Sequence, residues 1–266
     1  MSVVKLLIID PQYDFTNPNG ALYVSGADED SIRLADMIRR CGKRLSDITV
    51  TLDSHRSVHI AHPIWWVDSF GKHPDPFTLI ELADVEGNYP KWKAFSPSLQ
   101  DWSVKYINDL ESRGRYKHCI WPPHCLIGST GYSVQNNIFS SLMEWEADFK
   151  AVNWVTKGSC IFTEHFSALM AEVPFSKDPT TMLNKRFIES FQDADLIGIT
   201  GQALSHCVKY TVEDFADNFG ENNIKKFCFI ENTCSSVTGF EKQGEDFISG
   251  MKTRGMQVCN SDEFLI

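Results

Sequence analysis

The 266-residue sequence has no apolar run of the roughly 18 residues that a membrane-spanning helix requires. It also lacks a secretory signal at its start, because the opening segment MSVVKLLIID is too short and carries a charge too early. These two absences lead us to expect a soluble protein of the cytoplasm, with no membrane partner.

Cysteine pairs of the C-x-x-C type are absent as well. The chain has eight cysteines, which are dilute for its length, so we expect reduced thiols and not a disulfide framework. No Walker loop and no G-x-G-x-x-G follows a candidate strand, and a nucleotide-binding cradle therefore has no support.

Positive charge is in deficit. The sequence has 25 Lys and Arg against 35 Asp and Glu, which gives a formal net charge of −10 and argues against a nucleic-acid partner. The charges are interspersed, without the single-sign blocks of a disordered tail, and there is no internal repeat. With 42% hydrophobic residues, the chain is long enough to bury a large core, and we expect one domain over residues 1–266.

Short β-branched and apolar runs alternate with amphipathic segments along the chain. The predicted strands are 3–9, 48–52, 150–156, 196–200, 226–230 and 256–259. The predicted helices are 28–41, 134–145, 204–215 and 240–253, the first with Ile32, Ala35, Met37 and Ile38 on one face. This alternation predicts an α/β, Rossmann-like, doubly wound and mostly parallel six-stranded sheet flanked by helices.

Residues 61–116 interrupt the alternation. This segment is rich in proline and aromatic residues and contains one helical pattern, at 98–112. We interpret it as a long insertion within the single domain, and we expect Trp65, Trp66 and Phe70 to form its core.

Four of the apolar runs end at or near a reactive residue: Asp10, Asp53, Lys157 and Cys207. Each has an ordinary interpretation as well, since Asp caps turns, Lys before Gly is commonly a solvated loop charge, and a lone Cys is commonly a small buried hydrophobe. The carboxyl ends of parallel strands meet at one edge of a sheet, so a shared site explains all four positions together.

A second pattern points to a metal. Asp53-x-His55 places two side chains on the same side of an extended chain, and a distant His would complete a face of two His and one carboxylate. His59, His62 and His73 follow, and the spacing alone leaves each open as a ligand or as a loop residue.

Five motifs, in order, resemble those of the nicotinamidases and the wider isochorismatase-like hydrolases. They are Leu-Ile-Ile-Asp10-Pro-Gln12-Tyr-Asp14-Phe15, Thr-Leu-Asp53-Ser-His55, Trp121-Pro-Pro-His124-Cys125 with Gly128 and Gly131, Lys157-Gly158 with Glu164-His-Phe-Ser167, and Gly201-Gln-Ala203-Leu-Ser-His-Cys207-Val208. The W-P-P-H-C segment is the most specific of the five.

The resemblance implies a site. It implies catalytic Asp10, Lys157 and Cys207, one divalent metal ion (Zn, with Mn or Fe as alternatives) on Asp53, His55 and His124, and ring packing by Phe15 and Trp121. It also implies oxyanion donors at the backbone N–H groups of Ala203 and Cys207, and a cis peptide at Gln202–Ala203. The family's habit implies a homo-oligomer. Two departures are the 61–116 insertion and His206, which precedes Cys207 where Tyr or Asp is more familiar.

The implied reaction is hydrolysis of nicotinamide to nicotinate and ammonia through a thioester on Cys207. Lys157 and the N-terminus of the helix that holds Cys207 are expected to favour the thiolate, and Asp10 to accept and return the proton. Two alternatives are hydrolysis of another small amide in a pocket reshaped by the insertion, and a non-catalytic binding protein that retains the fold.

Overall fold

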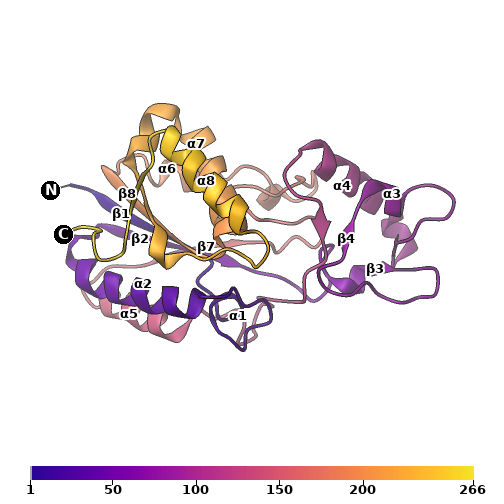
Figure 1. Ribbon diagram of the computed structural model, residues 1–266, viewed down its shortest axis with the longest axis horizontal. Coiled ribbons are helices and arrows are strands. Elements are labelled where there is room, and N and C mark those ends of the chain that lie inside the picture. Colours follow the sequence, from indigo (N-terminus) through magenta and orange to yellow (C-terminus); the bar gives the residue numbers. More distant parts are fainter. Residues whose placement is uncertain (1) are drawn as a thin grey trace.

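A six-stranded parallel sheet forms the centre of the protein in the computed structural model, which describes residues 2–266 (Figure 1). The strand order is β10-β9-β8-β1-β2-β7, and all five neighbouring pairs are parallel. The strands are β1 (Val4–Ile9), β2 (Asp47–Asp53), β7 (Asn153–Lys157), β8 (Leu196–Gly201), β9 (Phe227–Ile230) and β10 (Gln257–Cys259). The predicted fold class is confirmed, and the boundaries of the six strands agree within three residues.

Helices cover both faces of this sheet (Figure 1). One face carries α2 (Ala27–Cys41) and α5 (Asn136–Glu146), and the other carries α6 (Lys185–Glu189), α7 (Lys209–Phe219) and α8 (Glu241–Thr253). A π-helical turn, η5 (Leu204–Val208), leads into α7, and α1 (Tyr13–Thr16) is a single turn after β1. Short 3₁₀ turns lie at Gly42–Arg44, Pro63–Trp65, Pro97–Leu99, Pro179–Thr181, Glu221–Lys226 and Glu231–Thr233.

Each helical layer buries its own apolar core against the sheet. Ile9, Ile199 and Phe229 pack with α7 and α8 on one side, and Leu6, Ile48 and Val50 pack with α2 and α5 on the other. This two-sided burial explains why the central strands read as continuous apolar runs.

Ile32 was predicted on the buried face of α2, and that prediction is wrong, since the residue is 55% exposed. The buried stripe of this helix runs through Leu34, Ala35 and Ile38. Ile32 instead shares a face with the exposed residues Glu29 and Asp36, three and four positions away.

The chain reverses its direction of winding between two central strands. It passes from β1 outward through β2 to β7, then returns to β8 beside β1 and continues outward through β9 to β10. In open α/β sheets, ligands bind beyond the carboxyl ends of the strands at such a switch point. Here that position lies beyond the ends of β1 and β8.

Residues 61–116 form most of a small unit that projects from one end of the sheet (Figure 1). It contains α3 (Leu82–Val85), α4 (Gln100–Ser112) and two short antiparallel pairs. These pairs are β3 (Trp66–Val67) with β5 (Lys93–Ala94), and β4 (Leu79–Ile80) with β6 (His118–Cys119).

Trp65 and Trp66 lie in the core of this unit, as predicted. Phe70 does not, since it is 94% exposed. It lies in the turn closed by Asp68, whose backbone N–H donates to Lys72 O, and this turn faces solvent.

The projecting unit is fastened to the segments that follow β7. The indole N–H of Trp102 donates to the Phe162 carbonyl at 2.8 Å. Arg115 forms ion pairs with Glu172 and with Asp214, the latter on α7. These contacts attach the end of the insertion close to the carboxyl edge of the sheet.

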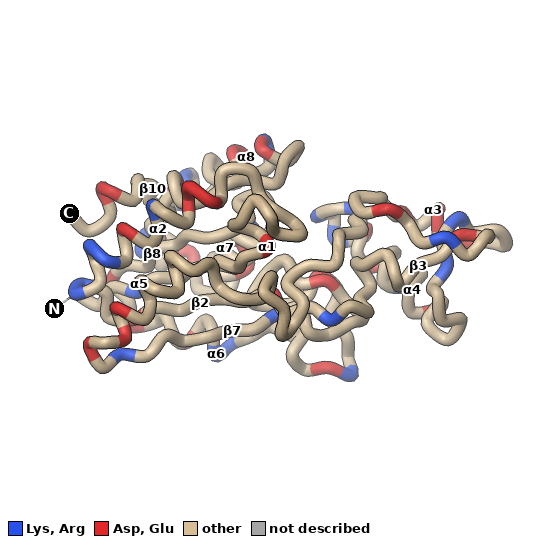
Figure 2. The backbone as a smooth tube through the Cα atoms, turned by 90° about the horizontal axis from the view of Figure 1, so that it is seen from below, with Lys and Arg blue, Asp and Glu red and all other residues tan. Residues whose placement is uncertain are grey.

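The positions of Lys and Arg and those of Asp and Glu are interspersed along the backbone in Figure 2. Within residues 2–266, no helix is both long enough and apolar enough to cross a membrane.

Candidate active site and metal centre

The four residues singled out at strand ends lie together beyond the carboxyl edge of the sheet. Lys157 is at their centre, with its Nζ 2.9 Å from Asp10 Oδ2, 3.2 Å from Asp53 Oδ1 and 3.5 Å from Cys207 Sγ. The same ammonium donates to the His165 carbonyl at 2.9 Å. One buried cation at the end of β7 therefore connects two carboxylates, at the ends of β1 and β2, with a thiol in the turn that follows β8.

Burial and the two carboxylates shift the pKa of Lys157 in opposite directions. Burial disfavours the ammonium, but Asp10 and Asp53 hold its pKa well above the ordinary value. Lys157 therefore stays charged, and it supplies a fixed positive charge beside the thiol.

Asp10 is fully buried and adopts a positive φ of 45° directly after β1. Thr51 donates its hydroxyl proton to Asp10 Oδ1 at 2.6 Å and accepts from the Asp10 backbone N–H at 3.1 Å. Burial raises the pKa of Asp10, against the opposing influence of Lys157 and Thr51. A carboxylate with a raised pKa is a stronger proton acceptor, which suits a general base.

Cys207 lies in the π-helical turn η5, at the start of the helical segment that continues as α7. Its thiol is buried and lies 3.5 Å from Lys157 Nζ, the ammonium that also contacts Asp10. Burial raises the pKa of Cys207 well above its usual value, although Lys157 acts to lower it. Lys157 therefore favours the thiolate, as expected, while burial opposes it, because the anion loses its hydration inside the protein.

The turn that precedes Cys207 has the geometry that the sequence predicted. The Gln202–Ala203 peptide bond is cis. The backbone N–H of Ala203 has no acceptor within residues 2–266, and Ala203 lines the same pocket as Cys207. A free N–H at this position is the kind of donor that an oxyanion requires.

Asp53, His55 and His124 converge next to Lys157. Asp53 Oδ2 lies 3.0 Å from His55 Nε2 and 3.4 Å from His124 Nε2, while its Oδ1 faces Lys157. One ligand atom from each of the three lies within 4.8 Å of the others. His124 Nδ1 donates to the Pro122 carbonyl at 2.8 Å, so its Nε2 carries the lone pair. The donor set and its tautomer fit a divalent metal ion.

The charges of this set also suit a cation. Burial opposes ionisation of Asp53, but His55 and Lys157 hold its pKa well below the usual range. Metal ligands must be deprotonated, so a buried carboxylate that is already ionised can bind a metal ion without first losing a proton.

His59 and His62, which the spacing left open as metal ligands, differ in how many of their ring nitrogens form hydrogen bonds. His59 uses both ring nitrogens within the protein: Nε2 donates to Thr163 O at 3.1 Å, and Nδ1 accepts from Ala61 N at 3.2 Å. His62 uses only Nδ1, which donates to Ser57 O at 3.2 Å. His73 lies in the insertion and bonds to the carbonyl of Trp66.

Two polar residues of the first motif hold the site in place. Gln12 accepts from the Asp53 backbone N–H and donates to the Asp53 carbonyl, both at 2.7 Å. Asp14 accepts from the backbone N–H of Cys125 at 2.7 Å, which fixes the segment that presents His124. The motif therefore positions both halves of the candidate metal set.

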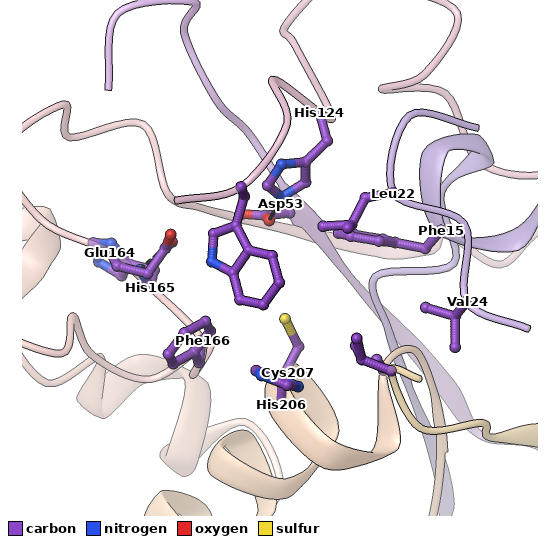
Figure 3. A pocket seen from close by; sticks show the side chains of 13 residues that line it. Phe15, Leu22, Val24, Asp53, His124, Glu164, His165, Phe166, His206 and Cys207 are labelled. Atoms are coloured by element: carbon purple, nitrogen blue, oxygen red, sulfur yellow. Dashed lines mark hydrogen bonds and ion pairs between the residues drawn. The ribbon is translucent and has the colours of Figure 1, made fainter. Parts of the chain in front are cut away.

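A narrow cavity lies above Cys207 (Figure 3). In Figure 3 the Cys207 sulfur points into it, with Asp53 and His124 on the opposite wall. The aromatic walls include Phe15, Trp121 and Phe166. Both predicted substrate-contacting aromatic residues thus line the cavity.

Several lining residues were not identified as functional from the sequence. Glu164 faces the cavity with Oε1 3.9 Å from His55 Nε2, and its Oε2 is buried without a hydrogen-bond partner. Its position in the motif after Lys157 was the available signal. His165 and Phe166 belong to the same motif segment, and His206 belongs to the motif that holds Cys207. The remaining lining residues lie outside the five motifs: Leu22, Val24 and Val237.

His206 lines the cavity beside Cys207, and its Nδ1 is 2.9 Å from Ser205 Oγ. Burial lowers the pKa of His206 to about 3. This ring packs against Tyr116, the last residue of the insertion, with the centroids 4.7 Å apart and the planes tilted by 34°, so the insertion contributes to the outer wall of the site.

No protein-family model matches the sequence. The nicotinamidase of Saccharomyces cerevisiae is 27% identical to this chain over 213 residues, which are 80% of this chain and 81% of the yeast protein. The similarity extends over most of both proteins.

Solved structures share the fold over the whole chain. A nicotinamidase and pyrazinamidase of Acinetobacter baumanii matches with a TM-score of 0.66 and 20% identity, over 100% of this chain and 99% of its own. A pyrazinamidase of Pyrococcus horikoshii, solved in complex with zinc, matches with a TM-score of 0.55 and 17% identity, over 97% and 98% of the two chains.

Proposed function

Because the chain belongs to the nicotinamidase and isochorismatase-like family, we propose that it hydrolyses nicotinamide to nicotinate and ammonia. The observation that carries the proposal is the contact of Cys207 Sγ with Lys157 Nζ, and of Lys157 Nζ with Asp10 Oδ2, beneath an aromatic cavity. A nucleophile, a proton acceptor and a cation within hydrogen-bond reach form the group that covalent amide hydrolysis requires.

Asp10 drives the first step. Burial raises the pKa of the Cys207 thiol, and in this scheme the thiol proton passes to Asp10 as sulfur attacks the amide carbon. Lys157 stabilises the sulfur anion during the transfer. The C–N bond then breaks, Asp10 returns the proton to the departing ammonia, and a thioester remains on Cys207. Water adds to this thioester after giving a proton to Asp10, and nicotinate leaves as Cys207 regains its proton.

The backbone around Cys207 supplies the oxyanion donors in this scheme. The N–H groups of Ala203 and Cys207 would bind the oxygen that becomes negative in each tetrahedral intermediate. Removing one donor of this kind typically raises the reaction barrier by about 2.7–4 kcal/mol. They need no side chain, which leaves the cavity walls free to contact the ring.

Asp53, His55 and His124 would hold one divalent metal ion, with zinc the leading candidate and Mn or Fe as alternatives. When bound, the ion supplies a Lewis-acidic position for the pyridine nitrogen and so orients the ring. Phe15 and Trp121 would pack against that ring and direct its carboxamide toward Cys207.

A second substrate class is favoured by one observation. Another cavity, lined in part by Leu79, Tyr116 and Phe240, shares Trp121, Phe166 and His206 with the first. Leu79 and Tyr116 belong to the insertion, so this space could admit a small amide that extends beyond a single ring. A binding protein that retained the fold would need none of the contacts between Asp10, Lys157 and Cys207.

Ammonia release is the test. We expect the wild-type protein, loaded with zinc, to release ammonia from nicotinamide faster than from a panel of aliphatic and larger aromatic amides. The Cys207→Ala variant should fold normally and lose at least ~10³-fold in kcat, because no other Cys, Ser or Thr lines this cavity in the part of the chain that the structure describes. Substantial activity of this variant would contradict the assignment of Cys207, and no release from any amide by the wild type would contradict the proposed function.

A cytoplasmic location and a homo-oligomeric state belong to the same proposal. All eight cysteines are free thiols, which suits a reducing compartment. Sedimentation velocity of the purified protein would measure its oligomeric state.

A further inference from the structure

His62 is a buried histidine with one ring nitrogen unused. Its Nδ1 lies 3.2 Å from the Ser57 carbonyl, and a carbonyl can only accept, so Nδ1 carries the proton. The remaining nitrogen, Nε2, therefore holds a lone pair. It is buried and has no hydrogen-bond partner within residues 2–266. A buried acceptor without a partner is costly unless it serves another group.

His55 has a buried ring nitrogen that lacks a hydrogen-bond acceptor among the described residues. Its Nε2 faces Asp53 Oδ2 at 3.0 Å, on the side where the candidate metal set converges. A histidine that ligates through Nε2 is protonated at Nδ1 and normally donates that proton to a neighbouring acceptor. His55 Nδ1 is buried, and like His62 Nε2 it lacks a partner in the described part of the chain.

The two rings are close enough to satisfy each other. Their centroids are 5.3 Å apart at an interplanar angle of 70°. Ring nitrogens of His55, His59 and His62 lie within 4.8 Å of one another. This is a separation that one bridging water can span. His59 is not available, because both of its ring nitrogens are bonded to the backbone.

We propose that His62 is a positioning residue for the metal ligand His55. Its Nε2 accepts a hydrogen bond from the N–H at His55 Nδ1, through one water or after a small rotation of the ring. It thereby fixes the tautomer and orientation in which His55 Nε2 meets the metal. The inference rests on the metal set of the proposed function and adds to it the acceptor behind one ligand.

The grouping of the side chains favours this role over direct ligation. The convergent metal set consists of Asp53, His55 and His124, whereas His62 groups with His55 and His59. The second group has no carboxylate, and His59 already bonds to the backbone through both ring nitrogens, so it offers fewer free ligands than the first group. The His62 ring packs beside the metal set, with its centroid 5.3 Å from that of His55 and 5.7 Å from that of His124. Its contribution is to the basicity and direction of a ligand, which typically amounts to 10- to 100-fold in metal affinity.

The test measures zinc affinity of the whole chain by competition with a chromophoric chelator, after the protein has been stripped of metal. His62→Phe replaces one planar ring by another without an acceptor, and His62→Gln restores an acceptor oxygen. His118→Phe is the matched control, because His118 is equally buried and bonds to a backbone carbonyl, Ile60 O, but lies outside the metal set. If His62→Phe does not fold, His62→Leu takes its place.

We expect zinc affinity to fall 10- to 100-fold in His62→Phe, to recover in part in His62→Gln, and to change less than threefold in His118→Phe. X-ray absorption of the zinc-loaded protein should count two histidine ligands in both the wild type and His62→Phe. An affinity of His62→Phe within threefold of the wild type would overturn the inference. So would a count of three histidines that falls to two in the variant, since His62 would then be a ligand itself.

Failure of the proposed function would be recognised separately. Ammonia release is measured on the wild type alone, so a protein that binds zinc and depends on His62, yet hydrolyses no amide, would contradict the function and leave the positioning role standing. A wild type that binds no zinc would overturn the positioning role.

Discussion

At the scale of single residues, the site is held by one buried cation between two buried carboxylates. Lys157 lies 2.9 Å from Asp10 Oδ2 and 3.2 Å from Asp53 Oδ1, and its side chain is 1% exposed. Removing one partner from a buried ion pair typically costs 3–5 kcal/mol, because a charge remains buried without compensation.

We therefore predict that Lys157→Met lowers the free energy of unfolding of the metal-free protein by about 3–5 kcal/mol. It should also reduce kcat by at least 100-fold, since the thiol loses its cation. Urea denaturation with a chelator present measures the first effect. Adding Asp10→Asn to Lys157→Met should restore part of the stability, because it removes one unpaired charge. A double variant less stable than Lys157→Met would contradict this explanation.

The sequence predicted most residues of the site but not their partners. Asp10, Lys157 and Cys207 were indicated by their strand-end positions, and the structure brings them into contact. Thr51, which donates to Asp10, could not be predicted, since a Thr inside an apolar strand reads as an ordinary β-branched residue. The partners of His55 and His59 depend on loops whose paths the sequence does not determine.

At the scale of elements, the ends of strands determine how closely the reactive groups approach. β7 ends at Lys157 and is followed by Gly158, which has a φ of +82°. A Cβ at this position would lie 2.6 Å from Asp53 Oδ1 and 3.1 Å from His55 Cε1. The absence of a side chain here therefore leaves room for two candidate metal ligands.

Gly158→Ala should weaken zinc binding by at least tenfold, because the added methyl displaces Asp53 and His55. Gly87→Ala is the matched control: Gly87 has nearly the same φ, +83°, and nothing lies within 4 Å of the position its Cβ would occupy. Both variants should lose about 1–2 kcal/mol of stability from the left-handed backbone, but only Gly158→Ala should lose metal affinity. Equal zinc affinities of the two variants would show that the crowding at Gly158 is relieved elsewhere.

Strand prediction succeeded where both faces of a strand are covered. β1 and β8 are fully buried apart from Leu196, and their apolar runs match the observed elements within a residue. β7 is an edge strand with mostly exposed side chains, and it begins three residues later than predicted, at Asn153. The apolar side chains of β7 are exposed or half-buried, so they do not mark a buried strand. The apolar pattern therefore predicted the start of this strand poorly.

At the scale of the whole molecule, the sequence located the insertion but could not place it. Its composition indicated a separate small core, which Trp65 and Trp66 help to form. Its last residue, Tyr116, packs against His206 beside the site, and this packing depends on contacts between segments far apart in the chain. Local patterns carry no information about such contacts.

The candidate metal set also connects distant parts of the molecule, since Asp53 ends β2 and His124 follows the insertion. A metal that binds the folded chain and not the unfolded one stabilises it, by about 2.7 kcal/mol when its free concentration is 100 times Kd. For a chain of this size, that corresponds to a rise in Tm of roughly 5–10 °C.

We predict this rise when zinc is added to the metal-free protein at that concentration, with reversal by a chelator. His124→Ala should show less bound metal and a clearly smaller rise at the same zinc concentration, because the loss of one of three ligands raises Kd. Scanning calorimetry measures Tm, and elemental analysis measures bound metal. An equal rise in His124→Ala, with unchanged metal content, would mean that zinc binds elsewhere on the chain, and His124 would then have no part in the metal site.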